Sequence, residues 1–282
     1  MSADSALRRA RSIPLAALLV AIFVLFGRTA DYDPASRAVL VALLLVAAAL
    51  AAWFGGARAL ASGDAARRLQ AAAGILLVAP FALLALLVGI GPPHEQPPAD
   101  NALRFLVLAV DALLAGSGLL VLRQALADAG ETFWSTAGAT AATWATPLYV
   151  AFALVQRCDY VAVMHGWSWA ESVSGTLREL TALDAFSMGA LFLAGLLTYV
   201  ATAAFAAALA CAGWIGRRAA GVFMAISGVA LAFLVARGFG YPSLEAAFAH
   251  WYSIPGFVVG IPAVPWMMPC AMGVLLLRRA GN

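Results

Sequence analysis

The stretch from Ile254 to Gly273, IPGFVVGIPAVPWMMPCAMG, decides the fold of this chain. It is apolar over about twenty residues, which at about 1.5 Å per helical residue is enough to cross a hydrocarbon core about 30 Å thick. It also contains four prolines, of which Pro262, Pro265 and Pro269 are internal. We therefore expect a membrane-spanning helix whose hydrogen-bond ladder is interrupted from within.

Each internal proline lacks the N–H that would bond the carbonyl four residues back, which frees the carbonyls of Val258, Ile261 and Pro265. Hydrocarbon offers these carbonyls no partner, so they need a hydroxyl, a water molecule or a cavity beside them. The prolines recur at i, i+3 and i+7, so the interruptions share one helical face. Broken helices with released carbonyls are typical of transporter binding sites near the membrane midplane. The alternative is a kinked helix that serves packing alone.

The composition places the whole chain in the membrane class. Hydrophobic residues make up 64% of the 282 residues and charged residues 11%, and the mean hydropathy is +0.92. No soluble domain has this composition. The chain has no lysine, which excludes a retinal Schiff base, a Walker A loop and a lysine nucleophile. The arginines stand at the ends of apolar segments, so we expect no nucleic-acid partner.

Apolar windows of about 19 residues predict a single integral membrane domain over 1–282, an all-α bundle of about eight transmembrane helices. The predicted spans are 13–27, 38–54, 71–90, 102–122, 133–155, 186–214, 219–236 and 255–277.

The arginines indicate how these spans are threaded. If the N-terminus is cytoplasmic, one side carries eleven arginines and the other carries six. The eleven are Arg8, Arg9, Arg11, Arg58, Arg67, Arg68, Arg123, Arg217, Arg218, Arg278 and Arg279. The positive-inside rule then predicts that both termini are cytoplasmic, and we expect a multi-pass protein of a cell membrane, the bacterial inner membrane.

Asp111 is the acidic residue deepest in a predicted span. It lies about 13 Å along the helix that starts at Ala102, near the middle of the membrane. A carboxylate at that depth costs at least about 2.5 kcal/mol on insertion scales, so it should face the bundle and is a functional candidate by default. A structural bridge between helices is the alternative. Gly116 and Gly118 follow, so this half of the span should pack closely on a neighbour.

The next span carries a stripe of hydroxyl groups on one helical face. Thr136, Thr140 and Thr143 follow Thr132 at spacings of four, four and three. With Thr198 on the following span, we interpret this face as the wall of a polar passage that includes Asp111. The alternative is that the hydroxyls bond back to carbonyls of their own helix.

The segment 156–184 is predicted to lie on the outer side, its second half forming an amphipathic helix at the membrane interface. All three histidines, His94, His165 and His250, fall on the same side. Together with Glu171 they would be the ligands of a divalent metal at the outer face, in the manner of catalytic zinc. They share no ligand spacing, so the leading interpretation has no metal and no other cofactor.

The favoured function is a small permease or ligand-binding membrane protein. Its polar site lies between the fourth, fifth, sixth and eighth spans, and comprises Asp111, Thr136, Thr140, Thr143, Thr198, Val258, Ile261, Pro262 and Pro265. The expected partners are membrane lipid and a small polar solute or cation. Two alternatives stay open: a membrane-embedded enzyme with an outward-facing, metal-dependent site, and a structural subunit of a larger membrane complex.

Overall fold

Every element of the described chain is helical. The structure is a computed structural model and describes residues 12–26, 28, 30–90, 96–166, 176–237 and 264–281. The α-helices are α2 (Ile13–Phe26), α3 (Pro34–Gly55), α4 (Ala65–Leu83), α5 (Pro98–Asp128), α6 (Phe133–Met164), α7 (Thr176–Cys211), α8 (Arg217–Arg237) and α11 (Val264–Ala280). Two 3₁₀ helices, η1 (Ala57–Ala61) and η2 (Leu84–Leu87), flank α4 in the chain.

These eight α-helices correspond to the eight predicted spans. Within the described residues, six helical segments are long and apolar enough to cross a membrane. They lie in α3, α4 with η2, α5, α6, α7 and α8. The apolar α2 is shorter, at 14 residues, and the described part of the last span, α11, has 17.

Two predictions about the helix boundaries need correction. The second half of 156–184 was predicted to form a separate interfacial helix, but residues 176–184 are the first turns of α7, which continues without a break to Cys211. The rest of that predicted helix, residues 168–175, lies outside the described residues. The fourth and fifth spans also extend beyond their predicted ends, to Asp128 and Met164.

Local sequence explains where the helices start and turn. Asp33 caps α3 by accepting hydrogen bonds from the N–H groups of Ala35 and Ser36, at 3.1 and 3.0 Å, and Pro34 follows at a position where its missing N–H has no cost. Gly130, between α5 and α6, has a φ of 87°, and Gly213, between α7 and α8, has a φ of 68°. These left-handed conformations favour glycine, and the short turns make successive helices antiparallel neighbours.

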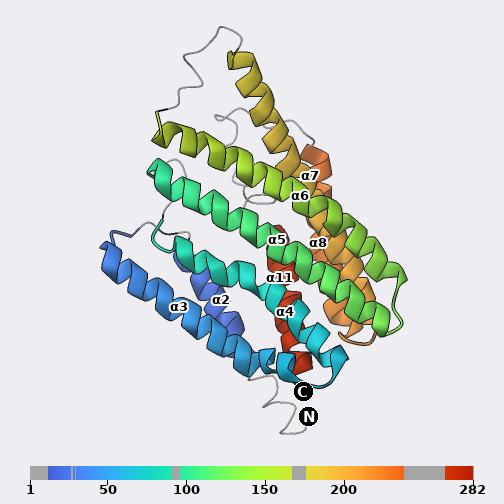
Figure 1. The fold of residues 1–282 in the computed structure, drawn as a ribbon. Helices are drawn as coiled ribbons and strands as arrows, with labels where there is room; N and C mark the ends of the chain where they lie inside the picture. The colour runs from blue at the N-terminus through green and yellow to red at the C-terminus, as the bar shows by residue number, and fades with distance from the viewer. Residues whose placement is uncertain are drawn as a thin grey trace.

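The helices from α4 to α8 pack in chain order, and α11 packs against α4 (Figure 1). Glycines allow the closest approaches, as predicted for α5. A Cβ on Gly118 would lie 2.9 Å from Leu77 of α4, and a Cβ on Gly116 would collide with Thr146 of α6. Small residues of this kind let membrane helices approach through their backbones.

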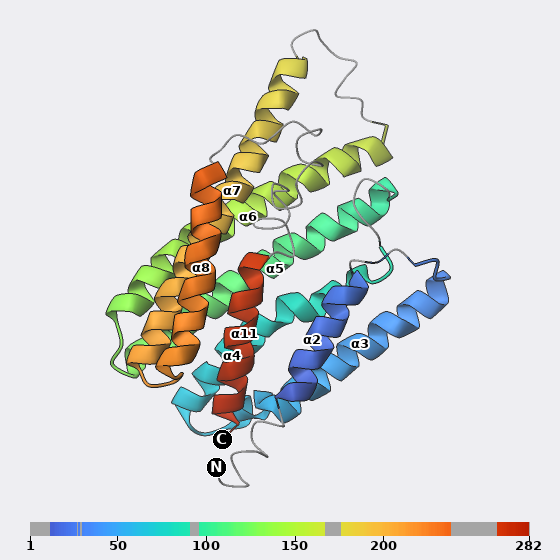
Figure 2. The ribbon, with the colours of Figure 1, turned by 180° about the vertical axis from the view of Figure 1, so that it is seen from behind.

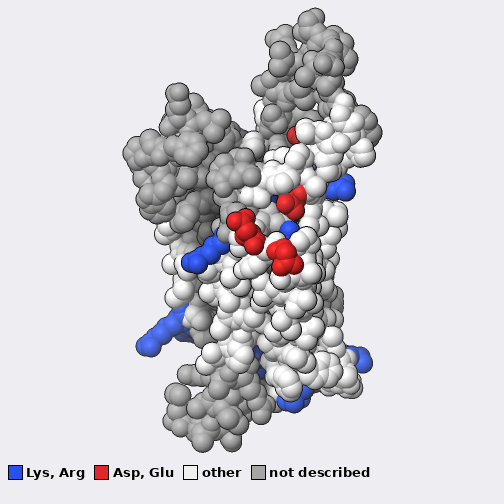
Figure 3. Space-filling model, turned by 90° about the vertical axis from the view of Figure 1, so that its left-hand side faces the viewer, with Lys and Arg blue, Asp and Glu red and all other residues white. Residues whose placement is uncertain are grey.

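One end of the bundle gathers the end of α3, the start of α2 and the end of α11. A Cβ on Gly56 would collide with the carbonyl of Leu277, and Leu15 lies beside Gly55. Arg278 and Arg279, both predicted to be cytoplasmic, stand at this end. Figure 3 shows arginines there and a group of acidic side chains toward the opposite end. At that opposite end Arg37 pairs with Asp100 at 3.7 Å.

Candidate functional site

Asp111 is the central feature of the candidate site. Its side chain points into the bundle and is 0% exposed. Neither carboxylate oxygen has a hydrogen-bonding partner among the described residues. A buried polar group without a partner carries its full desolvation cost, so the carboxyl of Asp111 destabilises the folded state.

A small cavity lies between α5, α6, α7 and α11, and Ala115, one helical turn from Asp111, is one of its lining residues. Its volume is about 20 Å³, enough for about one water molecule. The lining residues are Ala112, Ala115, Gly116, Leu119, Ala142, Ala145, Thr146, Tyr149, Thr198, Trp266 and Pro269. Asp111 itself is not among them, but it adjoins Ala112 and stands one helical turn from Ala115. These four helices are the ones that the sequence predicted to meet at a polar site.

The polar groups that face the cavity come from α6 and α7. Thr146 donates its hydroxyl to the carbonyl of Ala142 at 2.9 Å, and Thr198 donates to the carbonyl of Ala194 at 2.7 Å. Both donors are therefore used within their own helices, which leaves the threonine oxygens as acceptors. Tyr149 is buried beside Thr198, and its hydroxyl has no partner with full hydrogen-bond geometry among the described residues.

The last helix closes the cavity with its first described turns. Trp266 meets the ring of Tyr149 edge-on, with centroids 5.0 Å apart, and Pro269 lines the cavity wall. Because Pro269 has no N–H, the carbonyl of the buried Pro265 has no donor four residues on. Of the predicted carbonyl positions, Val258, Ile261 and Pro262 lie outside the described residues.

The threonine stripe of α6 lies elsewhere. Thr136, Thr140 and Thr143 are exposed on the surface of α6, and none of them lines the cavity. Thr140 donates to the carbonyl of Thr136 at 3.0 Å, and Thr143 donates to the carbonyl of Ala139 at 2.8 Å. The structure thus brings Thr198 to the cavity, whereas the hydroxyls of Thr140 and Thr143 bond to their own helix and Thr136 is exposed.

Sequence reasoning missed three cavity residues, Thr146, Tyr149 and Trp266. A signal existed for the first two. Thr146 and Tyr149 lie on the face of α6 that also carries the buried Ala142 and Ala153, so they are the polar groups of the buried face. The stripe of Thr136, Thr140 and Thr143 follows a neighbouring face, which is exposed.

The predicted metal ligands do not form a site in the described part of the chain. There, no group of three or more histidine, cysteine, aspartate or glutamate side chains is arranged to hold a metal ion. His165 is exposed just after the end of α6. His94, His250 and Glu171 lie outside the described residues.

Comparison with known proteins adds no further assignment, because no family model, curated protein or solved structure matches this chain.

Proposed function

We propose that this chain is a small multi-pass membrane permease or ligand-binding membrane protein, with its polar site between α5, α6, α7 and α11. The observation that carries the proposal is the buried carboxylate of Asp111 without a partner in the described chain. Acidic residues inside membrane helices mark ion and solute pathways more often than they serve packing. The adjoining cavity supplies a place where a ligand would be held.

The chemistry around the cavity favours a ligand that donates hydrogen bonds or carries positive charge. Thr146 and Thr198 have already given their hydroxyl protons to backbone carbonyls, so they offer lone pairs only. Asp111, one helical turn from the lining residue Ala115, is an acceptor when ionised, and the hydroxyl of Tyr149 can donate or accept. Such a set, in which acceptors prevail, suits a monovalent cation, a proton or an ammonium group. The small volume means that any larger solute requires the helices to move apart.

A panel of ligands tests directly whether the site binds a cation or an ammonium group. The purified protein in detergent is heated with monovalent cations, small ammonium compounds or neutral polar solutes. A ligand that binds the folded state raises the unfolding midpoint. We expect a cation or ammonium compound to raise it for the wild type and not for Asp111→Asn. If no member of the panel raises the wild-type midpoint, or if both proteins respond equally, the site is not at Asp111.

The exposed threonine stripe favours a second candidate, a subunit of a larger membrane complex. Thr136, Thr140 and Thr143 form an outward face with small neighbours, a surface on which another membrane helix can pack closely. A stoichiometric partner that co-purifies with the wild type, and that is lost with Thr140→Leu, would favour this candidate.

A further inference from the structure

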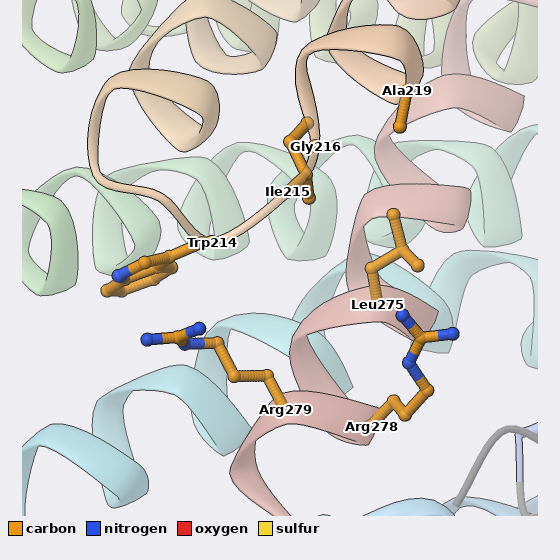
Figure 4. A pocket seen from close by; sticks show the side chains of 7 residues that line it. All are labelled: Trp214, Ile215, Gly216, Ala219, Leu275, Arg278 and Arg279. Atoms are coloured by element: carbon orange, nitrogen blue, oxygen red, sulfur yellow. The ribbon is translucent and has the colours of Figure 1, made fainter. Parts of the chain in front are cut away.

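A second hollow lies at the other end of α11, beneath the turn that joins α7 to α8. Its volume is about 280 Å³. It is lined by Trp214, Ile215, Gly216, Ala219, Leu275, Arg278 and Arg279. Figure 4 shows the turn on one side and α11 on the other, with Arg279 reaching toward the ring of Trp214 and Arg278 rising beside Leu275. We refer to this hollow as the basic pocket.

The basic pocket carries positive charge without an acidic counterpart. None of the described aspartates or glutamates lines it, and the ion pairs of the described chain join other residues, Arg37 with Asp100 and Arg67 with Asp64. The guanidinium carbon of Arg279 lies 5.0 Å from the centroid of the Trp214 ring, which holds this side chain in place. Arginine in such a setting is suited to phosphate, which it binds through paired N–H groups.

An apolar groove shares the same face of α11. It has a volume of about 260 Å³ and lies between α11, α2 and α4. Its walls are Ala16, Leu19, Val20, Phe23, Phe81, Met267, Met268, Cys270, Ala271 and Val274. The groove and the basic pocket are linked by helical spacing along α11. Arg278 follows Val274 by four residues, and Leu275 follows Ala271 by four. Figure 2 shows α11 between α2 and α8. The apolar groove lies on the α2 side of α11 and the basic pocket on the α8 side, and the two come closest at the consecutive residues Val274 and Leu275.

The length of this face matches one lipid chain. From Met267 to Arg278 the helix rises about 16 Å at about 1.5 Å per residue. One leaflet of a hydrocarbon core about 30 Å thick is about 15 Å deep. A phosphate at Arg278 would therefore stand at the level of the headgroups while an acyl chain reached as far as Met267.

We propose that α11 binds an anionic phospholipid, with the phosphate held by Arg278 and Arg279 and one acyl chain lying along Val274, Ala271 and Met267. The charge of the basic pocket selects a negatively charged headgroup. The apolar groove that begins at Val274, four residues before Arg278, selects a lipid over a soluble phosphate. Basic pockets between membrane helices are known to hold anionic headgroups in this way.

The test compares three probes on the full-length protein in a neutral detergent: phosphatidylglycerol, phosphatidylcholine with the same chains, and inorganic phosphate. Native mass spectrometry measures the fraction of protein that carries each one. The variant is Arg278→Gln with Arg279→Gln. The control, Arg67→Gln with Arg68→Gln, removes the same charge from the start of α4, outside the basic pocket. A second variant, Ala271→Phe, fills the apolar groove and leaves both arginines in place.

We expect the wild type and the control to prefer phosphatidylglycerol over phosphatidylcholine by about tenfold or more. The double arginine variant should lose that preference, and Ala271→Phe should bind both lipids more weakly. An equal loss in variant and control would mean nonspecific attraction to charge, and overturn the proposal. Two other results would overturn the proposal. One is displacement of the lipid by inorganic phosphate at similar concentration, and the other is unchanged lipid binding in both Ala271→Phe and the arginine variant.

Discussion

Gly74 and Gly273 meet backbone to backbone where α4 crosses α11. A Cβ added to either residue would lie 2.9 Å from the carbonyl oxygen of the other. This reciprocal contact anchors the last helix against α4 and thereby fixes where Trp266 and Pro269 reach the cavity.

Substituting these glycines should loosen α11. Gly273→Ala forces two backbones apart, and overpacking of this kind costs about 1–3 kcal/mol. The free energy of unfolding, measured by denaturant titration in mixed micelles, should fall by that amount. Gly228→Ala in α8 is the matched control, because no atom of the described residues lies within 4 Å of its added Cβ and alanine favours a helix. A Gly273→Ala variant as stable as this control would show that the crossing is not as close as described.

The cap of α3 should make stability depend on pH. The hydrogen bond from the side chain of Ser36, together with those from the backbone N–H groups of Ser36 and Ala35, holds the pKa of Asp33 below its ordinary value of 3.8. The lowered pKa means that the ionised cap stabilises the folded state. That contribution is fully present above about pH 5 and is lost as the pH falls through the folded pKa.

Asp33→Ala should therefore lower the unfolding midpoint at neutral pH and have less effect as the pH falls through the folded pKa of Asp33, which lies below 3.8, because the native carboxyl is then protonated. Asp33→Asn, which still caps the helix, should show a weaker dependence on pH than the wild type. Thermal unfolding across this range measures both. An Asp33→Ala defect of constant size from acid to neutral pH would contradict the assignment.

Comparing two threonines that make the same local hydrogen bond tests whether the ligand lies in the cavity or on the exposed face of α6. Thr198 and Thr140 each donate to the carbonyl four residues back, but Thr198 lines the cavity and Thr140 is exposed. Thr198→Val should weaken binding of the cation found in the ligand panel about tenfold, the loss of one acceptor contact. Thr140→Val should leave it unchanged. Equal effects of the two substitutions would place the ligand elsewhere.

Removing the carboxyl of Asp111 should not harm the fold. Because its oxygens have no partner in the described chain, Asp111→Leu eliminates a desolvation cost of about 1–3 kcal/mol. The free energy of unfolding should stay the same or rise, whereas Asp111→Asn, which leaves a buried polar group, should show no gain. A Leu variant that is less stable by about 2 kcal/mol or more would show that Asp111 holds helices together.

The sequence predicted the helices well because an apolar run of about twenty residues is a physical requirement for crossing a membrane. Their ends were less predictable, since α5 and α6 continue past the apolar windows to Asp128 and Met164. Nothing in the apolar pattern forbids a helix from extending into polar sequence. The close approaches at Gly116 and Gly118 were predicted correctly, because a glycine on a buried face has few other uses.

The site was only partly predictable. The spacing of Thr136, Thr140 and Thr143 shows that they share a face, but which way that face points depends on the neighbouring helices. Asp111 was placed inside the bundle because no other position satisfies a carboxyl group in a membrane. The cavity is formed by α5, α6 and α7 together with α11, which is far from them in the sequence, so its lining through Trp266 could not be read from any local pattern.

Flux through proteoliposomes tests the central claim most directly, with the cation from the ligand panel and equal amounts of wild type, Asp111→Asn, Asp111→Leu and Thr140→Val. The account predicts that Thr140→Val transports or binds the cation as the wild type does. Both Asp111 variants should neither transport nor bind it, although they remain folded. Wild-type behaviour in both Asp111 variants would contradict it.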